Sequence, residues 1–249
     1  MRLLADLLAA FALLTRLPVP MRRAVLLSQA VWAFPIVGAA IGTLSAGVYA
    51  LCYQAGMPPF LSSVWAVAAL VLLTGALHED GLADTVDGFG GDATLARKLE
   101  IMHDSRVGSY GALALMLLLM VRIAALTALA HPFRVLIALV VAASGGRAAM
   151  VVPLYLLPPA RQEGLSHTAA SPPLVSTLVA LASGALIAFG LMPPAIAGRV
   201  VAGMLAGALL LTWVTRRQIA GHTGDVLGAT SVVTEAVMLS ITVSTVDHA

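Results

Sequence analysis

The sequence predicts an all-α protein, a polytopic integral membrane helical bundle of about seven transmembrane helices plus an N-terminal interfacial or re-entrant helix. Of its 249 residues, 60% are hydrophobic and 10% are charged, whereas a typical soluble domain carries about 25% charged residues. The mean hydropathy is +0.97. The apolar residues also occur in runs long enough to cross a bilayer as helices. These three observations together indicate a membrane protein.

Seven apolar runs reach the roughly 17–25 residues that a transmembrane helix needs. In chain order they are 31–52, 61–77, 110–130, 134–157, 173–192, 197–215 and 229–246. The fourth is the weakest, because Ser144-Gly145-Gly146-Arg147 interrupts it. Arg122 and Arg147 fall inside spans, where a charge is costly and tends to face the bundle interior. Gly38 and Gly42 have the spacing of small residues that allows close helix packing.

Residues 1–14 precede the first run and contain one early arginine. They lack a small-residue cleavage site, so we interpret them as an interfacial or re-entrant helix and not as a removed signal peptide. Cys52 is the only cysteine, which excludes an intrachain disulfide and a thiolate zinc site. Residues 1–249 are interpreted as a single membrane-embedded catalytic domain.

Basic residues predict which side of the membrane each polar segment faces. With seven spans and the N-terminus inside, ten basic residues lie in inside segments and two, Arg134 and Arg199, lie outside. The ten are Arg2, Arg16, Arg22, Arg23, Arg97, Lys98, Arg106, Arg161, Arg216 and Arg217. This bias is typical of cytoplasmic loops. It places the polar segments 78–109, 158–173 and 216–228 on the cytoplasmic face, where they would form one site.

The pI near 9.0 is explained by this topology, so the expected partner is the lipid bilayer and no nucleic acid is expected. The sequence leaves open whether the chain forms a homo-oligomer.

Seven of the 12 acidic residues lie between residues 79 and 104. They are Glu79, Asp80, Asp84, Asp87, Asp92, Glu100 and Asp104. Like charges crowded this closely repel, so the cluster calls for a compensating cation. Asp80, Asp84 and Asp87 are spaced i, i+4, i+7 and would share one face of a helix. Oxygen ligands favour Mg²⁺, which suits phosphoryl transfer, and we therefore interpret 78–109 as a cytoplasmic metal-binding segment. The alternative is a solvent-exposed cytoplasmic loop whose charges only keep the loop hydrated.

Basic residues near the acids are candidates for anion contact. Arg106, close to the next span, is expected to contact substrate, whereas Arg97 and Lys98 could equally pair with the acids or with lipid headgroups. Arg161 could clamp an anion or anchor its loop at the membrane surface. His78 and His103 could be general bases, ligands or hydrogen-bonded structural residues.

A second polar motif is Gly221-His222-Thr223-Gly224-Asp225. Thr223 and Asp225 could cap the following helix, and the same geometry would offer backbone N–H groups to a phosphate. Glu235 is an acid inside a predicted span, so it is expected either to face the site or to pair with an intramembrane arginine.

These motifs together resemble the cobalamin synthase family, the adenosylcobinamide-GDP ribazoletransferases. The likeness is carried first by residues 78–88 (HEDGLADTVDG) and by 100–108 with Gly111. Residues 14–20 and 34–38 look like the family's N-terminal pattern, 159–165 like its central loop, and 221–229 with Glu235 like its C-terminal motif. Ala220 stands where a second glycine is expected in the family.

The resemblance implies a Mg²⁺-dependent phosphotransferase of the bacterial cytoplasmic (inner) membrane, with its active site facing the cytoplasm. It would join α-ribazole, or α-ribazole 5′-phosphate, to adenosylcobinamide-GDP with release of GMP, the last step of nucleotide-loop assembly. The implied metal ligands are Asp80, Asp84, Asp87 and Asp104. Glu100 or one of the aspartates would be the base. The residues implied to contact diphosphate or substrate are Arg16, His78, Arg106, Arg161, His222, Thr223, Asp225 and Glu235.

Two other functions would also use a membrane protein rich in clustered carboxylates. A CDP-alcohol phosphotransferase would share the pattern begun by Asp84-Thr85-Val86-Asp87-Gly88, but Gly91-Asp92 stands where Ala-Arg should be and the second half is missing. A divalent-cation transporter would place its carboxylates near the bilayer midplane in broken helices, whereas these acids are expected in a loop flanking the spans.

Overall fold

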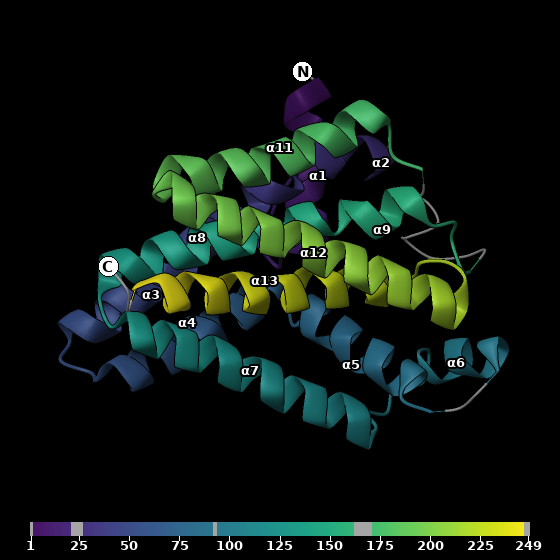
Figure 1. Cartoon of the computed structure of the whole chain (residues 1–249), viewed down its shortest axis with the longest axis horizontal. Helices are drawn as coiled ribbons and strands as arrows, with labels where there is room; N and C mark the ends of the chain where they lie inside the picture. The colour runs from purple at the N-terminus through teal and green to yellow at the C-terminus, as the bar shows by residue number, and fades with distance from the viewer. Residues whose placement is uncertain (1, 21–26, 92–93, 162–170, 247–249) are drawn as a thin grey trace.

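The computed structural model describes residues 2–20, 27–91, 94–161 and 171–246. Within these ranges the chain is helical and forms no β-strand, which confirms the predicted all-α class. The elements are α1 (Arg2–Leu14), α2 (Leu27–Ala30), the 3-10 turn η1 (Val31–Ala33), α3 (Phe34–Gln54), α4 (Pro59–Thr74), α5 (Leu77–Phe89), α6 (Leu95–Ile101), α7 (Ser109–Leu129), α8 (Pro132–Ala149), α9 (Val151–Leu156), α11 (Leu174–Leu191), α12 (Pro194–Ile219) and α13 (Gly224–Val246) (Figure 1).

The long helices confirm a multi-pass membrane protein. Among the described residues, six helices are long and apolar enough to cross a bilayer, and the bent pair α4–α5 brings the number to seven if it counts as one span. The predicted spans 110–130 and 173–192 match α7 and α11 closely. Helix α1 has 13 residues, fewer than the roughly 20 that a span requires.

The predicted span over 61–77 corresponds to α4, which reaches the length of a span only together with α5. Helix α4 ends at Thr74, and the chain turns through Gly75 and Ala76, whose φ angles are +64° and +59°. A glycine in the left-handed conformation is a common helix end, because it has no Cβ to clash. Helix α5 then leaves at 87° to α4. A hydropathy count does not detect this end, because Gly75 and Ala76 interrupt no apolar run.

The acidic stretch was therefore wrongly expected to be a loop beside the spans. Its first part is helix α5, which packs against α13 and α7 inside the bundle. His78 and Glu79, at the start of α5, are buried. The rest of the stretch includes the short helix α6. Asp92 lies outside the described residues.

The polar run at 144–147 does not interrupt the fourth span. All four residues are helical and buried in α8, and the helix breaks only at Met150, between α8 and α9. The two glycines give room to α13: a Cβ built at Gly145 would lie 2.3 Å from Met238 Cε, and one at Gly146 would lie 2.6 Å from Glu235 Cγ. The run is therefore a packing surface.

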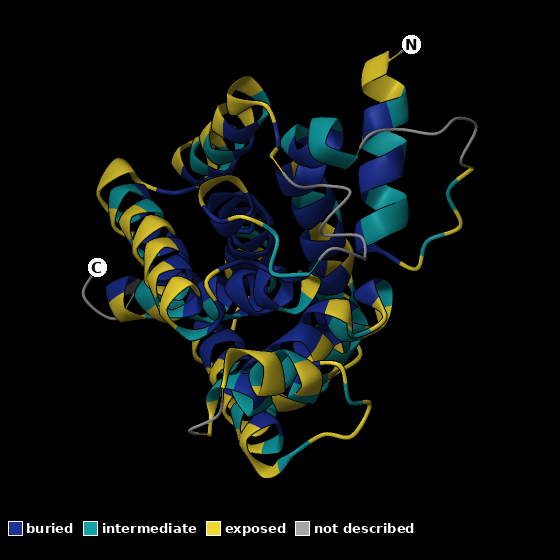
Figure 2. Cartoon of the chain, turned by 90° about the vertical axis from the view of Figure 1, so that its right-hand side faces the viewer, coloured by how far each residue is buried: buried dark blue, intermediate teal, exposed yellow. Residues whose placement is uncertain are grey.

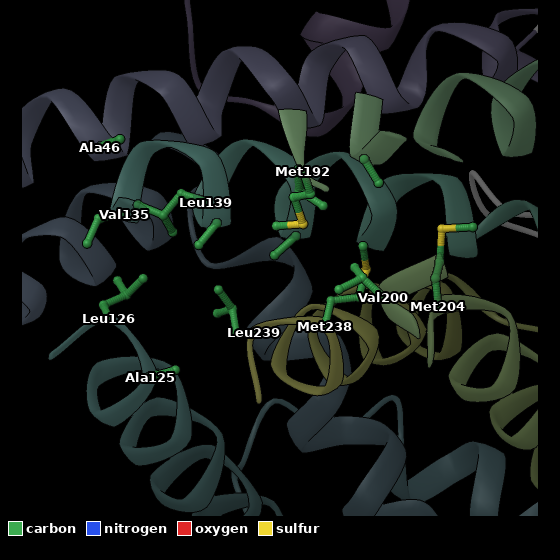
Figure 3. Packing of buried hydrophobic residues seen from close by; sticks show 14 of the residues in the cluster. Ala46, Ala125, Leu126, Val135, Leu139, Met192, Val200, Met204, Met238 and Leu239 are labelled. Atoms are coloured by element: carbon green, nitrogen blue, oxygen red, sulfur yellow. The ribbon is translucent and has the colours of Figure 1, made fainter. Parts of the chain in front are cut away.

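Small residues also bring α3 against α8, as their spacing predicts. A Cβ built at Gly38 would lie 2.2 Å from the carbonyl oxygen of Ala143, and one at Gly42 would lie 2.5 Å from that of Leu139. Such backbone approach is typical of membrane helix pairs. Figure 3 shows the adjoining apolar core, in which Leu126, Leu139 and Met238 come from α7, α8 and α13.

Exposed residues lie mostly on the outer faces of the bundle, and the residues on the inner faces are buried (Figure 2). Many of the exposed residues are large and apolar, including Leu72, Leu117 and Leu186. Outward apolar faces suit contact with lipid chains. Lipid tails are as apolar as leucine, so a leucine gains no hydrophobic free energy by moving from lipid into the helix bundle. Polar segments gather instead at one end, where α5, α6, the end of α9 and the turn between α12 and α13 meet (right in Figure 1).

Candidate active site

Helix α5 carries three of the predicted site residues, Asp80, Asp84 and Asp87. Their i, i+4, i+7 spacing lies on a continuous helix, which confirms the predicted common face. Asp80 is exposed, and Asp84 and Asp87 are partly buried. The row therefore runs along α5 at the polar end of the bundle.

The second element is the start of α13. Thr223 is buried, and its hydroxyl accepts a 3.3 Å hydrogen bond from the backbone N–H of Val226, which confirms the predicted cap. Asp225 lies in the first turn of α13, where the helix dipole favours a negative charge. The Oδ2 atom of Asp225 is buried and has no hydrogen-bond donor among the described residues.

Helices α5 and α13 approach through a glycine. A Cβ built at Gly81 would lie 2.7 Å from the carbonyl oxygen of Asp225. The Asp84 carboxylate consequently lies within electrostatic range of the carboxylates of Asp80, Asp225 and Asp87. The positive charge of Arg161 acts on Asp84 in the opposite direction. Asp80, Asp84 and Asp225 thus form the acidic centre of the site, drawn from two helices far apart in sequence.

The central loop joins the same site. The backbone N–H of His222 donates to Pro158 (2.8 Å), and that of Ala160 donates to His222 (2.9 Å). Arg161 Nη2 donates to the Leu99 carbonyl of α6 (2.9 Å), and its Nη1 lies 3.8 Å from Asp225 Oδ2. The predicted convergence of the three polar segments is therefore confirmed for their described parts. Residues 162–165 of this motif lie outside the described residues.

Asp87 has a second partner besides the acidic centre. Its carboxylate accepts hydrogen bonds from the backbone N–H groups of Gly108 (2.7 Å) and Gly111 (2.9 Å). These donors belong to the start of α7, whose first N–H groups have no intrahelical acceptor. Asp87 therefore caps α7 and fixes the end of α5 to it.

Asp104 and Glu100 lie on the outer side of the site. Asp104 bonds Arg106 at 2.6 Å, and these hydrogen bonds lower the pKa of the Asp104 carboxyl to about 2. Glu100 pairs with Arg97 at 2.7 Å. With Asp87 and Tyr110 these residues line an open cavity of about 530 Å³. The cavity is large enough to take part of a nucleotide-sized ligand.

The four-aspartate metal shell is not gathered as one cluster. Over the described ranges, no three His, Cys, Asp or Glu side chains lie close enough together to hold a metal ion. Asp87 is engaged with α7 and Asp104 with Arg106. Asp80, Asp84 and Asp225 are the carboxylates best suited to a hard cation, because Mg²⁺ keeps few protein ligands and shares its shell with phosphates.

Two predicted substrate contacts are buried in the bundle. His78 is fully buried, and neither of its ring nitrogens has a partner within the described part of the chain. Glu235 bonds Arg122 at 2.5 Å and also pairs with Arg147. Pairing with an intramembrane arginine was one of the two roles that its position predicted.

His222 lies beside the central loop of the site, whereas the contacts of Arg16 are with the end of α4. His222 is fully buried, and burial lowers the pKa of its imidazole to about 4, so the ring is neutral near pH 7. The backbone N–H of Arg16 donates to Leu73 (2.8 Å), and its side chain lies across Gly75, where α4 ends. Arg16 also borders an apolar cavity of about 620 Å³ between α3 and α4.

Sequence reasoning missed one partner in the interior. Glu79 bonds Arg122 at 2.7 Å and is 7% exposed. It was counted among the clustered acids and given no role of its own. The available signal was the pair of intramembrane arginines, since each needs a buried acid.

Most of the chain is similar to one family. A family model described as cobalamin-5-phosphate synthase matches residues 6–243. The chain is 42% identical over 245 residues to a protein of Bradyrhizobium diazoefficiens, covering 96% of this chain and 93% of the relative. It is 43% identical over 250 residues to one of Azorhizobium caulinodans, covering 96% and 95%. Both relatives are named adenosylcobinamide-GDP ribazoletransferase. No solved structure matches the chain.

Proposed function

Because this chain belongs to the cobalamin-5-phosphate synthase family, we propose that it joins α-ribazole, or its 5′-phosphate, to adenosylcobinamide-GDP and releases GMP. The product is adenosylcobalamin or its 5′-phosphate. The names of the relatives support this substrate pair. The observation that carries the proposal is the meeting of Asp80 and Asp84 on α5 with Asp225 on α13, beside Arg161.

The reaction is a phosphoryl transfer with a balanced exchange of bonds. The ribazole 3′-hydroxyl attacks the phosphorus linked to cobinamide, and the bond from that phosphorus to the GMP oxygen breaks. The hydroxyl proton passes to a carboxylate base, and GMP leaves with the electron pair. Positioning and charge stabilisation supply most of the catalysis in such reactions.

Over the described residues no three acidic side chains gather closely enough to hold an ion, so Mg²⁺ would be held by one or two of Asp80, Asp84 and Asp225 and would neutralise diphosphate charge. Arg161 lies at the edge of this acidic centre and would contact a phosphate oxygen. Arg106, with its side chain 87% exposed, would reach the diphosphate from the neighbouring cavity. Asp87 would act mainly by holding α5 against α7, which refines the role of metal ligand expected from the sequence.

The base is proposed to be one of the carboxylates of the acidic centre. Glu100, the other candidate, has a side chain 68% exposed and pairs with Arg97. A general base must lie within hydrogen-bond reach of the ribazole hydroxyl whose proton it takes. A partly buried carboxylate on a packed helix is held in place better than a carboxylate exposed to water.

We also propose that the polar end faces the cytoplasm and that the membrane is the bacterial inner membrane. Arg216 and Arg217 lie in the last turn of α12, at the polar end, whereas Arg199 lies near the beginning of that helix. Arg134 is likewise near the opposite end, at the start of α8. The asymmetry follows the positive-inside pattern.

Purified protein in detergent tests the proposal directly. Adenosylcobinamide-GDP and α-ribazole are supplied with Mg²⁺, and GMP and the new corrinoid are followed by chromatography. Equal amounts of both products are expected. No turnover by folded protein would contradict the proposal, and turnover of a CDP-alcohol substrate or ion flux in proteoliposomes would support the two alternatives instead.

A further inference from the structure

Four charged side chains from four helices meet in the interior of the bundle. Glu79 of α5 bonds Arg122 of α7 (2.7 Å), and Arg122 bonds Glu235 of α13 (2.5 Å). Glu235 also pairs with Arg147 of α8. All four residues are at most 7% exposed. We call Glu79, Arg122, Glu235 and Arg147 the buried network.

The buried network is electrically balanced. Two carboxylates alternate with two guanidinium groups in the order Glu79, Arg122, Glu235 and Arg147. Every charged group therefore contacts at least one group of opposite charge. The fold also makes room for it, since a Cβ at Gly146 would lie 2.6 Å from Glu235 Cγ and 2.7 Å from the Ser231 carbonyl oxygen. The network is therefore built into the helix packing.

Stability alone does not account for such a network. Buried ion pairs are often no more stabilising than apolar residues of the same volume, because desolvating the charges is costly. Their best-attested use is to fix the register of one element against another. These four side chains are therefore expected to fix the register of one helix of the bundle against another.

The contact that most needs fixing is the one between α5 and α13. At two close points it is made by glycine: Gly81 lies against Asp225, and a Cβ at Gly228 would lie 3.1 Å from His78 Cα. Glycine has no side chain to interlock with a neighbour. These pairings also show that the two helices run antiparallel, with the buried start of α5 lying deeper in the bundle than Asp225.

Glu79 is directly followed by Asp80 on the same helix. Each residue of a helix adds about 1.5 Å of rise and roughly 100° of rotation, so a slip or turn of α5 that broke the Glu79–Arg122 bond would carry Asp80 and Asp84 with it. Asp87 ties the other end of α5 to α7. The acidic row is thus held at both ends, and the deep end is held by the buried network.

We propose that Glu79, Arg122, Glu235 and Arg147 are positioning residues that set Asp80 and Asp84 of α5 in register with Asp225 of α13. They contact no substrate. What the aligned carboxylates do rests on the proposed function, but the alignment itself does not.

The test removes the Glu79–Arg122 bond without leaving a lone charge. The double substitution Glu79→Gln/Arg122→Gln is neutral and leaves the Arg147–Glu235 pair in place. Arg122→Lys is a second variant that keeps the charge but loses the fork that bridges two acids. Arg199→Gln is the control, because its guanidinium bonds Ala195 of its own helix (3.2 Å) and is exposed.

Register is measured by pulsed EPR between nitroxides at Gly91→Cys and Ser240→Cys in a Cys52→Ser background. A Cβ at Gly91 would meet no described residue beyond its chain neighbours within 4 Å, and Ser240 is exposed on α13. For the double variant we expect a shifted or broadened distance distribution and a fall in kcat of about 100-fold. KM should stay within about threefold, because binding residues are untouched. The control should match the wild type in both measurements.

An unchanged distance distribution in both variants would overturn the inference, whether or not kcat falls. If the double variant does not fold, Arg122→Lys decides by the same distances. If the wild type releases no GMP, the proposed function fails, while the spin-label distances still decide whether the buried network sets the register.

Discussion

Gly81 of α5 lies directly against the main chain of Asp225 at the start of α13, so close that a Cβ at Gly81 would be 2.7 Å from the Asp225 carbonyl oxygen. This approach brings the acidic row of α5 to the N-terminus of another helix, where negative charge and phosphate are both favoured. The chemistry proposed for the protein depends on this one contact between distant parts of the chain.

Gly81→Ala should therefore impair the reaction more than it impairs folding. The added methyl group would push α5 away from α13, and overpacking of this kind costs about 1–3 kcal/mol. We expect kcat to fall at least about tenfold, since a misplacement near 1 Å can cost more than that. Gly91→Ala is the matched control, because apart from its chain neighbours no described residue has an atom within 4 Å of a Cβ there. Equal kcat in the two variants would contradict the account.

Asp84→Asn tests the acidic centre. The substitution keeps the size of the side chain but removes the charge that would hold a cation, so we expect kcat to fall by at least about 100-fold. Membrane insertion should be normal, as judged by yield and gel filtration in detergent. Glu100→Gln, made in parallel, should retain most of the activity. Full activity of Asp84→Asn would remove Asp84 from the metal shell.

Asp87→Ala should lower stability by removing the cap of α7. Two backbone N–H groups would lose their acceptor, and loss of a helix cap costs about 0.5–2 kcal/mol. Thermal unfolding in detergent measures the effect. Asp104→Ala is the comparison, because its partner Arg106 is largely in water. A Tm shift for Asp104→Ala as large as that for Asp87→Ala would argue against the capping role.

The buried imidazole of His222 predicts a pH dependence of stability. Burial lowers the pKa of His222 to about 4 from its ordinary 6.5. Between these values the unfolded chain binds more protons than the folded one, so stability falls as pH drops from about 6.5 to about 4. His222→Gln should therefore lose less Tm than the wild type between pH 7.5 and pH 5. An identical loss in both proteins would contradict a neutral, buried His222.

Most of the fold could be predicted from the sequence, because apolar runs of membrane length form helices whatever their neighbours are. The break at Gly75–Ala76 could not be found by counting apolar residues, since both residues are themselves small and uncharged. The glycines at 145 and 146 suggested an interruption, but they serve close packing against α13. At both positions the structure depends on contacts between helices, which the composition of the local sequence does not show.

The individual motifs of the site could be predicted from the sequence, but most contacts between these motifs could not. Spacing alone placed Asp80, Asp84 and Asp87 on one helix face, and the motif at 221–225 indicated a cap. The sequence could not show that Asp87 would bond the start of α7 or that Asp225 would join Asp80 and Asp84, because these contacts depend on how three helices cross. Glu79 was hidden for the same reason, since its partner Arg122 is 43 residues away.

The central claim is that Asp80, Asp84 and Asp225 form a magnesium-dependent phosphoryl-transfer site, and GMP release against Mg²⁺ concentration tests it most directly. Purified protein is first treated with EDTA and then supplied with adenosylcobinamide-GDP and α-ribazole. The account predicts no GMP and no new corrinoid until Mg²⁺ is added, and then equal amounts of both. Full turnover in EDTA would contradict it.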